Sequence, residues 1–287
     1  MKYCVNSYSF GSYGAPDKLG VYGMIDKAAE CGFDGIEFTE SEWCNTSADE
    51  LAKIGSCVKE KGLETVSFCI GADFLYGSDE NLDREIERVC RLVDKAKLLG
   101  ASKMRHDVAY GFRGRKYGIG YADALPRLAE GCRRVTEYAE TVGVMTMTEN
   151  HGYFSQDADR VASLIDRVAH PNFGVLLDLG NFMCADEDPT LSVSRLAPYA
   201  FHVHAKDFLD KSAMEQNPGA EWFRTRAGNY LRGTVVGHGD AKIYQSIGIL
   251  KRTGYDGWLS LEFEGSEDNL KGIRLGLENL KRFWETC

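Results

Sequence analysis

The chain has 287 residues, of which 44% are hydrophobic and 27% are charged, and it carries a formal net charge of -9. This acidic balance argues against nucleic-acid binding, because a phosphate backbone attracts clustered Lys and Arg and repels an acidic surface. No apolar stretch approaches the roughly 20 residues that span a bilayer, and the first ten residues lack the pattern of a signal peptide, so we expect a cytoplasmic protein without a membrane partner.

The hydrophobic pattern predicts eight repeats of a strand followed by a helix. The first four predicted strands are YCVNSYSF, DGIEFT, LETVSFCI and SKMRHDV, with helices at about 19–31, 47–61, 80–99 and 119–142. The last four are VMTMTE, GVLLDL, AFHVHAK and WLSLEFE, with helices at about 157–169, 189–197, 240–253 and 267–285. Several helices are followed by glycine, as in CGFDG and KGLET, where a left-handed C-terminal cap is favourable.

Eight such units predict one (β/α)8 TIM barrel that takes up residues 1–287, since this fold usually needs roughly 250 residues plus loops. An open doubly wound sheet is the alternative, but the GxGxxG and Walker loops that would support it are absent from the sequence. A long irregular segment at about 208–239 follows the seventh predicted strand. Because connections of this length in a compact domain are usually functional, we expect it near the active-site mouth, although a solvated excursion anchored by Trp222 would give the same pattern.

Four potential metal ligands stand at the ends of the last four predicted strands. They are Glu149, Asp178, His204 and Glu262. A single carboxylate at such a position is more often a helix cap, but the C-terminal ends of barrel strands converge on one face. Three carboxylates gathered there are costly unless a cation neutralises them. Three oxygen donors and one nitrogen donor predict a divalent metal, with Mn2+ favoured and Mg2+, Co2+, Fe2+ or Zn2+ as alternatives.

Five runs of the sequence carry a family resemblance. They are TENHG (148–152), LLDLGNF (176–182), HVHAKDF (202–208), GHGD (237–240) and GYDGWLSLEFEG (254–265). Together they resemble the sugar phosphate isomerase/epimerase superfamily of xylose isomerase-like barrels, which includes ketose 3-epimerases, inosose dehydratases and, more distantly, endonuclease IV. The resemblance implies that Glu149, Asp178, His204 and Glu262 match the metal positions of the family.

Strand parity agrees with this assignment. His202 and His204 share one face of their strand, and the resemblance matches His204, which lies nearer the C-terminal mouth. His202 is then expected to face inward as an orienting residue. Glu262 and Glu264 also share a face, with Glu262 matching the ligand and Glu264 lying nearer the rim.

The predicted site supports chemistry through an ene-diolate. A divalent ion chelated by a carbonyl and the adjacent hydroxyl of a sugar acidifies the neighbouring C–H. If Glu149 and Glu262 lie on opposite sides of the substrate, one removes a proton and the other returns one to the opposite face, which inverts the carbon. The resemblance implies the same roles for both glutamates. We therefore predict an isomerase or epimerase of an unphosphorylated ketose, polyol or keto-inositol.

Other reactions remain open on the same residues. Loss of a β-hydroxyl after proton abstraction would make the enzyme a carbon-oxygen lyase of the inosose dehydratase type, and C-glycoside-cleaving relatives share the fold. An endonuclease IV-like nuclease and a non-catalytic barrel are remote alternatives. The family resemblance also allows a homo-oligomer, and no feature of the sequence decides this.

Five further side chains are predicted to contact the sugar or polyol substrate. They are Lys206, His106, His151, Asn181 and Arg226. Lys206 shares a strand face with His204 and could stabilise an enediolate oxygen or protonate a leaving hydroxyl. Asn181 departs from the Asp-x-x-His arrangement common in the epimerases, and a neutral amide does not titrate near pH 7 as an imidazole does.

Overall fold

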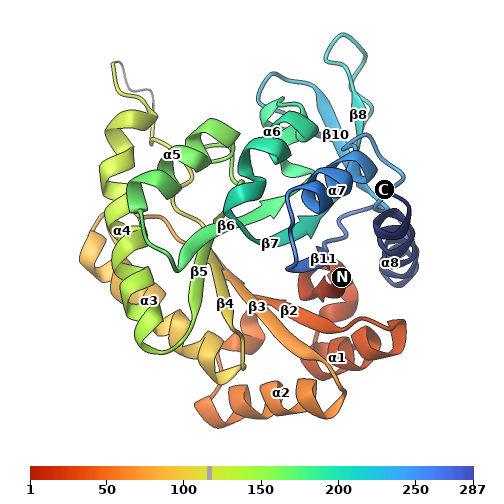
Figure 1. The fold of residues 1–287 in the computed structure, drawn as a ribbon, viewed down its shortest axis with the longest axis horizontal. Coiled ribbons are helices and arrows are strands. Elements are labelled where there is room, and N and C mark those ends of the chain that lie inside the picture. Colours follow the sequence, from red (N-terminus) through yellow and green to blue (C-terminus); the bar gives the residue numbers. More distant parts are fainter. Residues whose placement is uncertain (115–117) are drawn as a thin grey trace.

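The computed structural model describes residues 1–114 and 118–287, and in it eight parallel strands close into a barrel (Figure 1). The strands are β1 (Lys2–Asn6), β2 (Gly35–Thr39), β3 (Glu64–Ile70), β4 (Lys103–His106), β5 (Met145–Glu149), β6 (Phe173–Asp178), β7 (Ala200–Ala205) and β11 (Trp258–Leu261). Around the ring their order is β1, β11, β7, β6, β5, β4, β3, β2. The predicted (β/α)8 barrel is confirmed.

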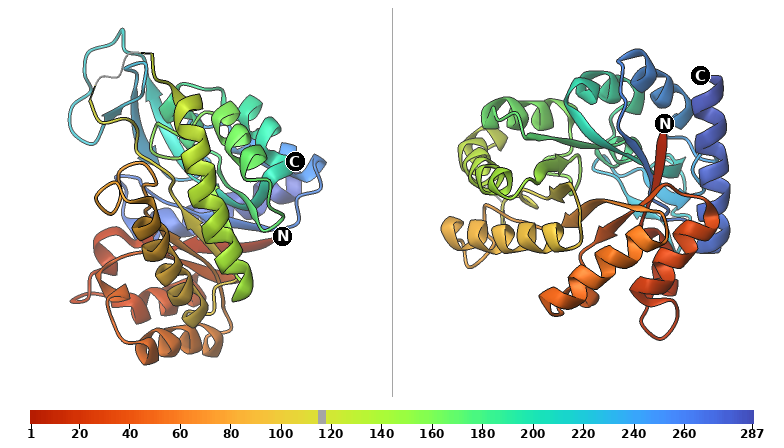
Figure 2. Two further views of the ribbon diagram at one scale, coloured as in Figure 1. Left: turned by 90° about the vertical axis from the view of Figure 1, so that its left-hand side faces the viewer. Right: turned by 60° about the horizontal axis from the view of Figure 1, so that its bottom comes forward.

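Eight α-helices surround this barrel, as the views in Figure 2 show. They are α1 (Gly20–Cys31), α2 (Ala48–Glu60), α3 (Leu82–Leu98), α4 (Tyr121–Thr141), α5 (Ala158–Val168), α6 (Pro189–Leu196), α7 (Ile243–Arg252) and α8 (Asn269–Thr286). Several begin at a side-chain cap: Ser47 accepts from the Glu50 N–H, and Asn81 accepts from the Arg84 N–H. No helix in the described ranges combines the length and apolarity of a membrane span.

The long segment after β7 is more regular than its sequence predicted. It contains a three-stranded antiparallel sheet of β8 (Asp207–Lys211), β10 (Tyr230–Thr234) and β9 (Phe223–Arg224), with β10 in the middle. These strands are short and are separated by a polar stretch rich in Gly and Asn, so no period-2 pattern is long enough to predict them. Because β8 begins two residues after β7 ends, the small sheet rises directly from the C-terminal mouth of the barrel.

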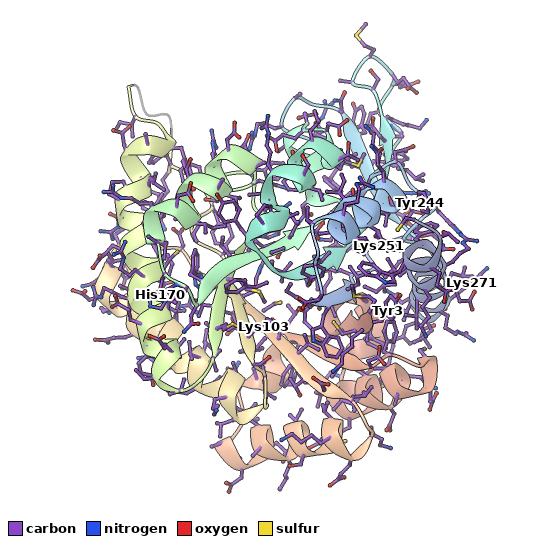
Figure 3. All side chains as sticks on the ribbon, in the orientation of Figure 1. Tyr3, Lys103, His170, Tyr244, Lys251 and Lys271 are labelled. Carbon is purple, nitrogen blue, oxygen red and sulfur yellow. The ribbon has the colours of Figure 1, made fainter. Side chains whose placement is uncertain are left out.

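Two kinds of side chain occupy the two faces of the barrel wall. The outer face is apolar and packs under the helices, with fully buried Ile36, Met104 and Val203 among its members. The inner face carries polar and charged residues that are equally buried, including Glu37 and His202. Figure 3 draws these side chains on the ribbon and labels Lys103, where β4 begins. A charged interior is unusual and points to the centre of the barrel as the place of chemistry.

Candidate metal centre

The four predicted ligands converge at the C-terminal mouth of the barrel. Glu149 ends β5, Asp178 ends β6, His204 lies on β7 and Glu262 follows β11 directly. These strands are consecutive around the ring, and Asp178 is the register partner of His204. One ligand atom of each residue lies within 4.8 Å of those of the other three. All four side chains are buried, with exposures between 0% and 8%.

Asp178 and His204 each turn one donor atom toward the centre of this quartet. Asp178 Oδ1 accepts hydrogen bonds of 2.8 Å from the backbone N–H groups of Gly180 and Asn181, which turns Oδ2 toward the centre. Asp178 Oδ2 and His204 Nδ1 have no hydrogen-bond partner among the described residues. His204 Nδ1 lies 3.3 Å from Glu262 Oε2, 3.9 Å from Asp178 Oδ2 and 4.0 Å from Glu149 Oε1. Donors that share one cation at about 2.1 Å are separated by comparable distances, so the quartet fits a divalent ion.

Crowding of the carboxylates changes their acidity. Burial raises the pKa of Asp178 to about 7, with Lys206 opposing the rise and the Glu149 and Glu262 charges adding to it. Burial would also raise the pKa of Glu262, but Lys206 and His204 hold it well below its usual range. A divalent cation would stabilise the ionised form of the three carboxylates and the neutral form of His204.

Glu37 supports the quartet from below and was missed by the sequence analysis. Its Oε1 lies 2.5 Å from Nε2 of His204 and its Oε2 lies 2.9 Å from Nε2 of His202. The Asn6 amide and the Ser260 hydroxyl also donate to Oε1 at 2.8 Å and 3.1 Å. Glu37 thus contacts both imidazoles directly. Glu37 therefore fixes the tautomer that presents His204 Nδ1 to the quartet.

Arg105 is the second residue that the sequence analysis missed. Its Nη2 lies 2.6 Å from Glu149 Oε2 and 3.1 Å from Asp107 Oδ1. The other oxygen of Glu149 accepts from the Asn181 amide at 2.9 Å. Both Glu37 and Arg105 are charged residues inside predicted apolar strands. A charge within an apolar run is the feature of the sequence that could have identified them as site residues.

Lys206 is the cation at the centre of the site. Its Nζ lies 2.6 Å from Glu262 Oε2, 3.4 Å from Glu264 Oε1 and 3.6 Å from Asp178 Oδ2. Burial would lower its pKa, but the surrounding carboxylates, Glu262 above all, raise it well above its usual range. The ammonium group also lies 3.4 Å from Asn181 Oδ1. The structure therefore brings Lys206 and Asn181 together with the quartet.

The remaining predicted substrate contacts take different positions. His151 lies at the rim, where its half-exposed imidazole meets Asp107 Oδ1 at 3.0 Å. Arg226 belongs to the segment after β9, and its guanidinium binds the Asp157 carboxylate at 2.5 Å and 3.0 Å and the Tyr153 carbonyl. It thereby ties the small sheet to the loop after β5.

The prediction that His106 contacts substrate is not supported by its position. The side chain is fully buried, and its ring packs edge-on against Phe74 and stacks on Phe173. Because Arg105 points into the barrel, the next residue along β4 points outward to the helices. Burial lowers the pKa of His106 to about 4, so this imidazole is neutral at pH 7.

A cavity of about 920 Å³ opens beside the quartet. Its wall is formed by segments that follow β1, β2 and β11, including Tyr8, Trp43 and Glu264. Glu264 also contacts Lys206, so this side chain borders both the cavity and the charged centre.

Comparisons with known proteins agree with this architecture. The profile of the family described as "Xylose isomerase-like TIM barrel" matches residues 25–283. Inosose dehydratase of Lacticaseibacillus casei is 27% identical over 143 residues, which are 50% of this chain and 48% of that protein. The chain thus spans about half the length of the curated relatives that it matches.

Solved structures extend the likeness over the whole barrel. A structure of L-ribulose 3-epimerase is 18% identical, covers 100% of this chain and 95% of its own, and has a TM-score of 0.75. A xylose isomerase-like TIM barrel protein from Mycobacterium smegmatis, solved in complex with magnesium, is 19% identical, covers 99% and 96%, and has a TM-score of 0.74. At these identities the structures establish the fold.

Proposed function

The chain belongs to the xylose isomerase-like TIM barrel family, and we propose that it is a divalent-metal-dependent isomerase or epimerase of a ketose or cyclitol. One observation carries the proposal. Glu149 and Glu262 come from the outer two of four neighbouring strands, and the strands that carry Asp178 and His204 lie between them. A sugar held over the centre would thus have one glutamate toward each side.

The proposed ion is held by Glu149, Asp178, His204 and Glu262, with Mn2+ favoured by the three oxygen donors and one nitrogen donor. When bound, a divalent ion polarises a carbonyl and its adjacent hydroxyl and so acidifies the C–H between them. The unpartnered Asp178 Oδ2 and His204 Nδ1 support this assignment within the described part of the chain.

The two glutamates would move the protons from different surroundings. Glu262 has Lys206 at 2.6 Å, which can compensate charge as the carboxylate gains or loses a proton. Glu149 is held by Arg105 on one oxygen and by Asn181 on the other, which fixes its orientation. A glutamate that takes a proton from one face and a second glutamate that returns one to the opposite face invert the carbon.

A carbon-oxygen lyase is the second candidate, and Lys206 favours it. Its ammonium group is almost fully buried among Asp178, Glu262 and Glu264, so it could deliver a proton to a leaving β-hydroxyl after the α-proton has been removed. The curated relative from L. casei is an inosose dehydratase, which is consistent with this outcome. The metal centre is common to both reactions.

An unphosphorylated substrate is favoured by the loop after β10. Backbone N–H groups at this position of a TIM barrel often bind phosphate. Here the Asp207 carboxylate accepts hydrogen bonds from the N–H groups of Gly237 and Gly239 at 2.9 Å and of Ala241 at 3.1 Å. Because a carboxylate of the chain already holds these donors, a substrate phosphate would have to displace it.

The test is proton exchange in heavy water with a panel of ketoses and inososes in the presence of Mn2+. We expect deuterium at the carbon next to the carbonyl, and an epimer without loss of water identifies the epimerase. An unsaturated or dione product identifies the lyase. Glu149→Gln and Glu262→Gln should each abolish exchange, whereas Glu278→Gln on the exposed surface of α8 should leave it unchanged.

Two results would contradict the proposal. Retention of full exchange by both site variants would exclude the two-glutamate mechanism. A protein that neither binds Mn2+ nor gains thermal stability from it would exclude the metal centre itself.

A further inference from the structure

The cavity beside the metal centre is larger than a monosaccharide needs. Its volume of about 920 Å³ lies near the upper end of the roughly 300–1,000 Å³ found for pockets that hold drug-sized ligands. It lies between the 3-10 helix and loop after β1 (Ser7–Gly14), the start of α1 and the segment after β2 (Glu42–Cys44). A substrate that reaches the quartet therefore has a second compartment next to it.

Side-chain contacts join this compartment to the residues of the charged centre. Glu264 lines the cavity, and its Oε1 is 3.4 Å from Lys206, which in turn contacts Glu262 at 2.6 Å. Tyr8 stands at the same border with an exposure of 54%, and the Glu264 charge, burial and the Glu262 charge raise the pKa of its phenol. Glu264 therefore borders both the cavity and the charged centre, and a ligand anchored at the quartet would enter the cavity past this side chain.

The cavity wall favours a flat apolar group. Leu19, Val21, Met24, Trp43 and Phe263 supply most of its apolar surface. Trp43 is braced by Phe38, whose ring centroid lies 5.1 Å away in an edge-to-face arrangement, so it offers a firm surface for stacking. A polyol alone would leave this apolar surface in contact with water.

The charges of the wall select against anions. Glu40, Glu42 and Glu264 line the cavity, and no Lys, Arg or His is found among the described residues of its wall. A phosphate or carboxylate placed there would meet carboxylates with no compensating cation. The group that fits is therefore apolar and carries no negative charge.

We propose that this cavity is a subsite for an uncharged aryl group carried by the substrate, so that the enzyme acts on an aryl-substituted sugar or cyclitol and not on a bare monosaccharide. The proposal rests on the proposed function for the position of the reacting sugar ring. The planarity, the size and the absence of negative charge on the substituent are inferred from Trp43, the cavity volume and the three glutamates.

Calorimetric binding of matched glucosides tests the subsite without turnover. Phenyl β-glucoside is expected to bind at least about tenfold more tightly than methyl β-glucoside, since burial of a phenyl ring is worth that much or more. Ala15→Trp should abolish this preference, because Ala15 lines the cavity and its φ of -60° and ψ of 144° suit a bulky residue. Ala220→Trp, on an exposed part of the segment after β8, is the matched control and should retain it.

A charged probe tests the selectivity of the wall. The 4-carboxyphenyl glucoside is expected to bind severalfold more weakly than the phenyl glucoside, and the double variant Glu40→Gln, Glu42→Gln should reduce this difference. Equal affinity for phenyl and methyl glucosides would overturn the proposal, as would a preference that survives Ala15→Trp in a folded protein. The titrations are carried out with and without Mn2+ to separate the aryl subsite from the proposed metal-dependent function. If metal-dependent proton exchange fails, a measured preference for the aryl glucoside still supports the subsite.

Discussion

Replacing Glu37 by Gln is expected to weaken Mn2+ binding by about 10–100-fold, the usual effect of removing the carboxylate behind a metal-bound imidazole. Glu37 contacts Nε2 of His204 at 2.5 Å, while Nδ1 of the same ring faces the quartet. Its negative charge makes the imidazole a better donor and holds the proton on Nε2. The expected loss corresponds to about 1.4–2.7 kcal/mol of binding free energy.

Gln is the right substitution because it keeps the volume and an acceptor oxygen. Glu37→Ala would leave the Asn6 amide, the Ser260 hydroxyl and two imidazoles facing a buried void, each at a cost of about 1–3 kcal/mol. Such a variant would confuse loss of folding with loss of metal affinity. In Glu37→Gln the amide oxygen can still accept from His204, so the change is mainly one of charge.

The assay is calorimetric titration of the metal-free protein with Mn2+, paired with the thermal unfolding midpoint in EDTA. Glu85→Gln is the control. Glu85 is also buried, but it pairs with Arg88 at 2.8 Å within α3, away from the quartet. It should lower the unfolding midpoint and leave Mn2+ affinity unchanged. The reasoning is refuted if folded Glu37→Gln binds Mn2+ within about twofold of the wild type.

Three further changes separate the roles of other residues. Lys206→Met should slow proton exchange by at least about 100-fold. The same change should strengthen Mn2+ binding in calorimetry, because it removes a cation 2.6 Å from Glu262. Weaker Mn2+ binding would contradict the expected competition between Lys206 and the ion. Burial lowers the pKa of His106 to about 4, whereas the imidazole of the unfolded chain titrates near 6.5. Between these pH values the unfolded state binds a proton that the folded state does not. The free energy of unfolding should therefore fall as pH drops from 6.5 to 4, by up to about 1.4 kcal/mol per pH unit. Urea denaturation should find a flatter pH dependence for His106→Gln, and an unchanged slope would count against the buried assignment. Arg226→Ala and Asp157→Asn should raise KM by similar factors, and the double variant should raise it little further, because both changes break the same ion pair between the small sheet and the loop after β5. Additive effects on KM would instead favour a direct contact of Arg226 with the substrate.

The barrel and the quartet were accessible from the sequence because both depend on local patterns. Each strand of the barrel and each α-helix was indicated by its hydrophobic periodicity, and Gly or a capping residue stood at many junctions. Glu149, Asp178 and Glu262 directly end or follow apolar runs, and barrel geometry brings such positions together whatever the details of packing. A local signal combined with a rule of the fold was therefore enough to predict that these residues converge.

The second layer was less accessible because it depends on which inner-face residues of distant strands meet. Glu37 on β2 reaches His204 on β7, although these strands are not neighbours in the ring. That contact crosses the barrel interior and is set by strand tilt and stagger, which the sequence does not state. The predicted substrate contact of His106 is not supported for a related reason. Side chains along β4 alternate between the two faces of the barrel wall, but only the ion pair of Arg105 with Glu149 shows which of them face inward.

The distribution of charge around the mouth links the metal centre to substrate choice. Carboxylates dominate it: Glu37, Asp107, Glu149, Asp178, Glu262 and Glu264 surround the centre. The buried cations Arg105 and Lys206 are each already paired with these carboxylates, and the N–H groups of the loop after β10 are held by Asp207. An anionic substrate would therefore have to compete with internal carboxylates for Arg105, Lys206 and these N–H groups. A neutral polyol needs only hydrogen bonds and a divalent ion. The same excess of negative charge that calls for a cation thus argues for an uncharged substrate.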